Sequence, residues 1–337
     1  MSETVLLTGA SGFIAKHVAL KLLNAGYDVR GTVRRLDRGD EVRAAVAPYL
    51  GEKAGSLSFV QADLESDAGW AEAMAGVSAV VHTASPFPIA QPKDPQDLIR
   101  PAVEGTRRVL EAAAAAGVKR VILTSSVAAV VDLSKGNHLH DEADWCDPTK
   151  DSATAYEKSK TLAERKAWEI AKARGMDLTT INPSLVLGPP LDEHYGSSLG
   201  LVERFLKGKD PMVPPMGIGI VDVRDVAEMH LRALQRPETA GKRFIASAGS
   251  LSFADMARTM KSAWPTRRIP TREAPKAIIR VLAWFDASIR TILPRLGHTD
   301  RISNARAVKE MGVEFTPPKA ALMASAEWLV KHGKAWA

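Results

Sequence analysis

Apolar and polar positions follow two different rhythms along the first two-thirds of the chain. Short apolar runs rich in β-branched residues predict strands, and longer stretches with apolar positions three and four apart predict helices. The strand runs are Val5–Leu7, Tyr27–Val33, Leu57–Val60, Ala79–His82, Arg120–Leu123 and Asp177–Ile181. The helical stretches are Phe13–Asn24, Asp40–Leu50, Ala68–Met74, Gln96–Ala116 and Ser152–Arg174. Strands that alternate with helices predict a doubly wound α/β fold around a parallel sheet.

The pattern changes after Asn182, where six prolines between positions 183 and 215 indicate an ordered, loop-rich excursion from the sheet. One further strand and helix, Ile218–Val221 and Val223–Gln235, resemble another unit of the first pattern. The later helical stretches are Ser252–Trp264, Ala274–Ile292 and Ala320–Lys331. We therefore expect a sheet domain of residues 1–182 plus 218–240, and a smaller, mostly helical domain of residues 183–217 plus 241–337.

Charge and cysteine content limit the classes of function. The 337 residues carry 45 basic and 39 acidic side chains, a net charge of +6, but the basic residues are scattered without interleaved aromatic side chains. We therefore expect no nucleic-acid partner. The single cysteine, Cys146, excludes an intramolecular disulfide, and no apolar run approaches the ~20 residues of a membrane span. The histidines form no convincing ligand set, so we expect a cytoplasmic protein without membrane association or a metal site.

A glycine-rich turn follows the first predicted strand and opens the first helix, with the sequence TGASGFIA at Thr8–Ala15. Gly9 permits a tight turn, and Gly12 lets backbone N–H groups approach a pyrophosphate at the positive end of the helix. This position, ahead of a second strand, predicts a Rossmann-type dinucleotide site. The contacting residues would be Gly9, Ser11, Gly12, Phe13 and Ile14.

The end of the second strand indicates which dinucleotide is bound. An NAD site places an acidic residue there to hold the ribose 2′-hydroxyl, whereas this chain has Arg34-Arg35, with Asp37 two residues later. Guanidinium groups bind a 2′-phosphate, which a carboxylate would repel, so the pair favours NADP(H). After the third strand, Asp63 and Leu64 are placed to bind and cover the adenine.

Three residues are candidates for the chemistry. Tyr156 and Lys160 lie four apart on one face of a predicted helix, and we expect the lysine, together with a cationic nicotinamide ring, to lower the pKa of the phenol. Ser126 closes the fifth strand, at the edge where a parallel sheet presents its ligand crevice. A serine, a tyrosine and a lysine in these places can orient a carbonyl and exchange a proton with it.

These features resemble the extended short-chain dehydrogenases/reductases, within the NAD-dependent epimerase/dehydratase superfamily. The resemblance extends over nearly the whole chain and is closest to the group of dihydroflavonol reductases, cinnamoyl-CoA reductases and microbial aldehyde or ketone reductases. Besides the glycine-rich turn, the matching stretches are GTVRR at Gly31–Arg35, QADL at Gln61–Leu64, VVHTASP at Val80–Pro86, LTSSVAAV at Leu123–Val130, AYEKSKTLAE at Ala155–Glu164, NPSLVLGPP at Asn182–Pro190 and VDVRDVA at Val221–Ala227.

The resemblance implies roles for individual residues. It makes Ser126, Tyr156 and Lys160 catalytic, and it assigns Arg34, with Arg38 as a looser second partner, to the 2′-phosphate. The other cofactor contacts that it implies are Thr83, Ala84, Ser85, Tyr156, Lys160, Pro183, Ser184, Val186 and Ser198. The activity implied is hydride transfer from NADPH to a small aldehyde or ketone, or oxidation of a secondary alcohol in reverse.

Two departures bear on the substrate. Val131 stands where plant dihydroflavonol reductases have an asparagine, and the NWYCY-like motif of cinnamoyl-CoA reductases is absent. Both favour a bacterial-type aldehyde or ketone reductase. A sugar-nucleotide epimerase or dehydratase, and a non-catalytic NADP(H) sensor, remain alternatives. Relatives often pair through the two long helices, Gln96–Ala116 and Ser152–Arg174, so a homodimer is the expected assembly and a monomer the alternative.

Overall fold

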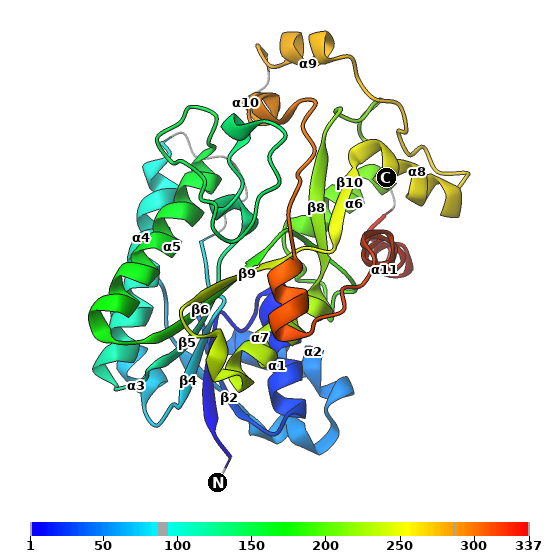
Figure 1. Ribbon diagram of the computed structural model, residues 1–337. Coiled ribbons are helices and arrows are strands. Elements are labelled where there is room, and N and C mark those ends of the chain that lie inside the picture. Colours follow the sequence, from blue (N-terminus) through cyan, green and yellow to red (C-terminus); the bar gives the residue numbers. More distant parts are fainter. Residues whose placement is uncertain (1, 87–93, 286, 336–337) are drawn as a thin grey trace.

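A computed structural model describes residues 2–86, 94–285 and 287–335. Its main sheet has seven strands, all parallel, in the order β3-β2-β1-β4-β5-β6-β9 (Figure 1). They are β1 (Thr4–Thr8), β2 (Asp28–Val33), β3 (Leu57–Gln61), β4 (Ala79–His82), β5 (Arg120–Thr124), β6 (Asp177–Pro183) and β9 (Lys242–Ala246). The chain reverses its direction of travel across the sheet between β1 and β4, which is where a doubly wound sheet binds ligands.

Helices cover both faces of this sheet (Figure 1). On one face lie α1 (Phe13–Asn24), α2 (Asp37–Val46) and α7 (Val223–Gln235); on the other lie α3 (Trp70–Met74), α4 (Gln96–Ala115) and α5 (Ala155–Arg174). Each face has its own apolar core, which contains Leu22 and Met229 on the first side and Leu110 and Ile170 on the second. The predicted Rossmann-type architecture is confirmed.

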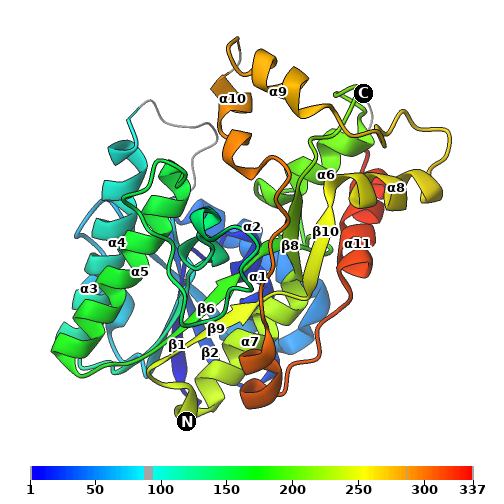
Figure 2. The same ribbon diagram turned by 45° about the horizontal axis from the view of Figure 1, so that its top comes forward.

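A second, smaller layer adjoins the carboxyl ends of the main strands (Figure 2). Its three-stranded sheet has the order β10-β8-β7. The elements are β7 (Leu185–Leu187), α6 (Ser198–Leu206), β8 (Gly217–Asp222), β10 (Gly249–Ser252), α8 (Phe253–Ala263), α9 (Lys276–Leu282), α10 (Ala287–Arg290) and α11 (Pro318–Lys331). Helices α6, α8 and α11 pack on this sheet around Val202, Met256 and Leu322.

The structure corrects two predicted strand assignments. The run Ile218–Val221 lies in β8 of the small sheet and does not extend the main one, while the seventh main strand is β9, at positions assigned to the smaller domain. The reason is that β9 pairs with β6 over Thr179–Pro183, a partner more than sixty residues earlier in the chain. Apolar runs of this length specify a strand but not its neighbour.

Helix ends also differ from the predictions. The second helix begins at Asp37, and the stretch predicted as one helix over Ala274–Ile292 forms α9 and α10 as separate short helices. Helix α5 begins at Ala155 because the Thr154 hydroxyl accepts the N–H of Glu157 and the Glu157 carboxylate accepts the N–H of Thr154. This capping box fixes the turn that carries Tyr156. In the described ranges, no helix combines the length and apolarity that crossing a bilayer requires.

Candidate active site

A cavity of about 590 Å³ opens at the carboxyl ends of β1, β4, β5 and β6. It lies where the sheet order reverses, so the topology alone predicts a ligand site here. Twelve of the predicted site residues line it: Gly12, Phe13, Ile14, Thr83, Ser85, Ser126, Tyr156, Lys160, Pro183, Ser184, Val186 and Ser198. Segments from six separate parts of the sequence therefore meet in one place.

The glycine-rich turn is shaped for close approach to a ligand. Gly9 has a φ of +66°, and a Cβ there would lie 2.9 Å from the Cα of Ala84. Gly12 is the N-cap of α1, and no side chain caps this helix end. The N–H groups of the first helical turn thus face the cavity without a side-chain acceptor, which suits the pyrophosphate of a dinucleotide.

A buried hydrogen-bond cluster locks this turn onto β4. Thr8 Oγ1 accepts the N–H groups of Thr83 and Ala84, each at 3.1 Å, and lies 2.7 Å from Nδ1 of the buried His82. Because both lone-pair directions of the oxygen accept N–H groups, its own proton is directed to His82. Thr83 Oγ1 in turn donates to the Thr8 carbonyl. Part of the predicted Thr83–Ser85 segment thus shapes the turn.

Ser126, Tyr156 and Lys160 face one another across the cavity. The hydroxyls of Ser126 and Tyr156 are hydrogen-bonded, and Lys160 Nζ lies 5.8 Å from the centre of the Tyr156 ring. Lys160 Nζ also donates to Ser85 Oγ at 2.9 Å. The three side chains of the predicted catalytic set are therefore brought together around one space.

The acidities in this cluster differ from the expectation. Burial raises the pKa of Tyr156, although its hydrogen bond with Ser126 acts in the opposite direction. In the protein without its cofactor the pKa of Tyr156 is therefore not lowered, because loss of solvation dominates; the lowering expected with a cationic nicotinamide ring in place stays a prediction. Burial also lowers the pKa of Lys160 to about 8, against the attraction of Glu164. Tyr156 is consequently protonated at neutral pH, as a proton donor must be.

The remaining predicted residues lie outside this cavity. Gly9 and Ala84 pack against each other behind it, and Ser11 lies in the turn. Asp63 and Leu64 follow β3; the Asp63 carboxylate accepts the N–H of Glu65. These two residues and Arg34 follow strands at the same sheet edge, on the β2 and β3 side of the turn.

The three arginines after β2 differ in their partners. Arg35 forms two hydrogen bonds with Asp37, and Arg38 contacts Glu41 at 2.8 Å and His194 at 3.3 Å. Arg34 is exposed and has no ion pair recorded within the described ranges. Arg34 is therefore the arginine whose guanidinium is available to a ligand.

Several residues that line the cavity were not predicted. Thr124 and Ser125 directly precede Ser126, while Tyr195, Gly196 and Ser197 come from the loop ahead of α6. The loop is held by an ion pair between Lys16 and Asp192. Ser198, the first residue of α6, was predicted from the family resemblance. Tyr195 and Gly196, just ahead of it, were the local signals that could have extended the prediction into the loop.

Comparison with known proteins agrees with this geometry. Residues 5–247 match the family described as the NAD dependent epimerase/dehydratase family. Cinnamoyl-CoA reductase 1 of Petunia hybrida is 35% identical over 98% of this chain and 93% of its own length. An anthocyanidin reductase of Vitis vinifera is 32% identical over 80% of this chain and 83% of its own.

A solved structure extends the likeness to three dimensions. The yeast methylglyoxal/isovaleraldehyde reductase in its NADPH complex superimposes with a TM-score of 0.81, at 29% identity, over 98% of this chain and 99% of its own. The match covers both the main sheet and the smaller layer. The chain thus belongs to the NAD-dependent epimerase/dehydratase family, the extended short-chain dehydrogenases/reductases.

Proposed function

We propose that the protein is an NADPH-dependent carbonyl reductase that converts an aldehyde or ketone into an alcohol and, in reverse, oxidises a secondary alcohol. The observation that carries this proposal is the meeting of Ser126, Tyr156 and Lys160 in the cavity that the open end of α1 also faces. Reductases among the relatives support the same reaction class.

The residues present fit a dinucleotide. The turn at Gly9–Gly12 would hold the pyrophosphate. Pro183, Ser184 and Val186 line the same cavity as Lys160, and the nicotinamide would lie against them. Arg34 would bind the 2′-phosphate through charge-assisted hydrogen bonds. When bound, NADPH supplies the hydride for the carbonyl carbon.

The chain's own residues supply the proton and the orientation. Tyr156, kept protonated by burial, donates its hydroxyl proton to the carbonyl oxygen as the oxygen becomes negative. Ser126, hydrogen-bonded to that hydroxyl, offers a second donor to the same oxygen. Lys160, anchored to Ser85, supplies the positive charge that stabilises the resulting phenolate.

For the substrate, we propose a small aldehyde or ketone of the kind reduced by microbial enzymes. The name of the yeast structural relative refers to two small carbonyl compounds, methylglyoxal and isovaleraldehyde. Val131, in place of the asparagine expected for flavonoid binding, is buried in an apolar cluster with Val127, Val130 and Ile245 and presents no polar group to a ligand.

We also propose a cytoplasmic homodimer that pairs through α4 and α5, which lie side by side on one face of the sheet (Figure 1). The outer surface of this helix pair would form a four-helix contact with a second copy. Light scattering should then give twice 36.3 kDa. A mass of one chain at working concentration would reject the pairing, and fractionation of the source cells would test the location.

One experiment separates the candidate functions. Purified protein is mixed with NADPH and a panel of aldehydes, ketones and diketones, and oxidation of the cofactor is followed by absorbance. Turnover on a carbonyl supports the reductase. Conversion of a nucleotide sugar without net NADPH consumption would instead indicate an epimerase or dehydratase, and NADPH binding without turnover on any compound would indicate a sensor.

A further inference from the structure

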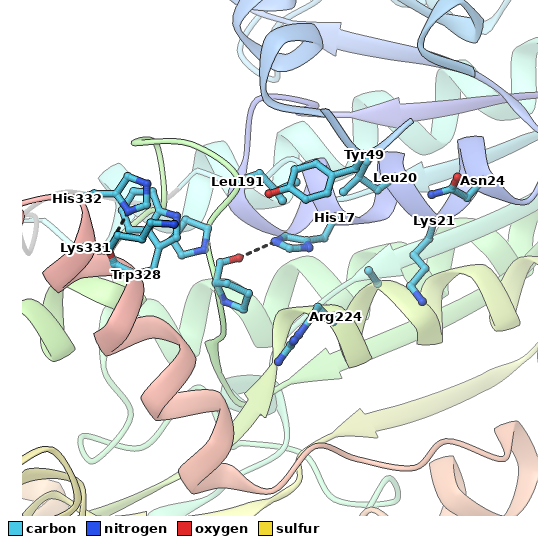
Figure 3. Close-up of a pocket in the computed structure, with 13 residues that line it drawn as sticks. His17, Leu20, Lys21, Asn24, Tyr49, Leu191, Arg224, Trp328, Lys331 and His332 are labelled. Atoms are coloured by element: carbon cyan, nitrogen blue, oxygen red, sulfur yellow. Dashed lines mark hydrogen bonds between the residues drawn. The ribbon is translucent and has the colours of Figure 1, made fainter. Parts of the chain in front are cut away.

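A second cavity, of about 750 Å³, lies along α1 on the C-terminal side of its first turn (Figure 3). We call it the back pocket. Its walls come from α1, the Pro189–Leu191 segment, the start of α7 and the end of α11. None of the residues proposed for catalysis or cofactor binding lines it.

The lining of the back pocket carries positive charge over an apolar floor. Lys21, Arg224 and Lys331 contribute cationic groups, and none of the thirteen lining residues is acidic. Lys21 forms an ion pair with Glu228 at 2.8 Å, and Arg224 forms one with Asp222 at 2.7 Å. Neither carboxylate lines the pocket. Lys331 has no ion pair among the described residues, so it is the cation available to an incoming anion.

Aromatic rings line part of the pocket. The ring of Trp328 stacks on His332 with centres 4.0 Å apart and planes 17° apart. Tyr49, with 58% of its surface exposed, lies between Leu191 and Leu20 in the view of Figure 3. Partly exposed aromatic rings beside apolar side chains suit a planar ring, because stacking removes apolar surface of both rings from water.

We propose that the back pocket binds a planar aromatic carboxylate, with its ring against the Trp328–His332 stack and its carboxylate at Lys331. Among the described residues that line the pocket, Lys331 is the cation without an ion pair, which matches a ligand with one negative charge. A ligand with more negative charge would have to take Lys21 from Glu228 or Arg224 from Asp222. The carboxylate left without its cation would then raise the free energy of the complex. The site is distinct from the proposed reductase cavity.

The two cavities share structural walls. Phe13 lines the candidate active site, and one turn later His17 lines the back pocket, with the two rings edge to face at 5.7 Å. Tyr195 of the first cavity contacts Trp328 of the second, with ring centres 5.6 Å apart. A ligand that fixes Trp328 therefore also restrains the loop beside the cofactor, so occupancy of the back pocket alters NADPH affinity. This coupling rests on the proposed function; the binding itself does not.

The test measures binding of naphthoate by isothermal titration calorimetry, with the uncharged naphthol as the matched probe. We expect naphthoate to bind with one site per chain and naphthol to bind more weakly. Lys331→Gln should weaken naphthoate by about tenfold, which is typical of a lost charge-assisted hydrogen bond, and Lys331→Arg should retain it. Lys334→Gln is the control, because Lys334 lies three residues further on, pairs with Glu193 and is outside the lining.

Each result decides one part of the proposal. Failure of naphthoate to bind, equal binding of naphthol, or unchanged affinity in a folded Lys331→Gln variant overturns the site. An NADPH dissociation constant that is the same with and without saturating naphthoate overturns the coupling, because linkage between two sites is reciprocal. If NADPH alone does not bind, the reductase proposal fails while naphthoate binding at Lys331 still stands.

Discussion

Glu164 and Arg243 form a buried ion pair behind the candidate active site, with a nitrogen–oxygen distance of 2.7 Å. Glu164 lies one turn beyond Lys160 on α5, and Arg243 lies on β9. The carboxylate also accepts hydrogen bonds from Ser125 Oγ at 2.5 Å and from Asn182 Nδ2 at 2.7 Å. One carboxylate therefore connects α5 with β6, β9 and the residue that follows β5.

Removing this charge should destabilise the fold. In Glu164→Gln the guanidinium of Arg243 stays buried without its counter-charge, a loss that costs about 3–5 kcal/mol in comparable pairs. We expect urea unfolding to show a decrease of this size in the free energy of unfolding. The control is Glu111→Gln, which breaks an exposed pair with Arg174 and should cost less than ~1 kcal/mol. Equal losses in the two variants would contradict the role of the buried pair.

Lys160 should give the reaction an alkaline limit. Burial lowers the pKa of Lys160 to about 8, and the negative charge of Glu164 opposes that shift. Since the ammonium form stabilises the phenolate, kcat/KM should decrease as the pH rises through about 8. In a folded Glu164→Gln variant the limit should move to lower pH, because a neutral amide no longer favours the charged lysine. A pH profile that stays flat far above the pKa of Lys160 would exclude this assignment.

Tyr156 should be required for turnover but not for cofactor binding. Tyr156→Phe keeps the ring and removes the proton donor, so kcat should fall by roughly a hundredfold or more. The NADPH dissociation constant, measured by fluorescence titration, should barely change because the lysine and the glycine-rich turn remain. Near-normal turnover of the variant on a confirmed substrate would show that another group supplies the proton.

Arg34 should determine cofactor preference. A bidentate arginine–phosphate contact contributes about 1.5–3 kcal/mol, so Arg34→Ser should weaken NADPH by roughly ten- to a hundredfold and leave NADH nearly unchanged. Arg35→Ser is the matched control, since Asp37 already holds that guanidinium. Parallel increases in both Michaelis constants would mean that Arg34 is structural. A wild-type preference for NADH would contradict the cofactor assignment and direct attention to Asp37.

Prediction from the sequence succeeded for residues that interact within one element and failed for residues that meet only in the folded chain. Tyr156 and Lys160 are four residues apart on one helix, so local periodicity was enough to place them together. The partner of Glu164 lies 79 residues away on β9, and nothing in the local pattern indicates that pairing. Likewise, the pKa of Tyr156 depends on how deeply the fold encloses the phenol, which the spacing to Lys160 does not determine.

Long-range packing also explains the errors in the fold. The strand at Gly217–Asp222 has the apolar pattern of a buried strand in either sheet, and only its pairing with β7 and β10 decides between them. The loop that brings Tyr195 to the cavity is positioned by Lys16 and Asp192, which are 176 residues apart. Sequence alone could identify both residues as charged, but not that they meet.

Buried histidines should make the protein sensitive to acid. Burial lowers the pKa of His82 to about 3 and that of His230 to about 4, while unfolded histidine has a pKa near 6.5. Below pH 6.5 the unfolded chain therefore binds more protons than the folded one, so stability is lost as the pH falls. At pH 5 each buried histidine should lower the free energy of unfolding by about 2 kcal/mol relative to neutral pH, because one pKa unit corresponds to ~1.4 kcal/mol.

A variant at His82 tests this effect. His82→Asn can still accept the hydroxyl of Thr8 but cannot be protonated, so its free energy of unfolding should change less between pH 7 and pH 5. His332→Asn, at an exposed position, is the control, and its loss of stability in acid should equal that of the wild type. If His82→Asn loses as much stability as the wild type between pH 7 and pH 5, then His82 either already carries its proton in the folded state or never gains one on unfolding.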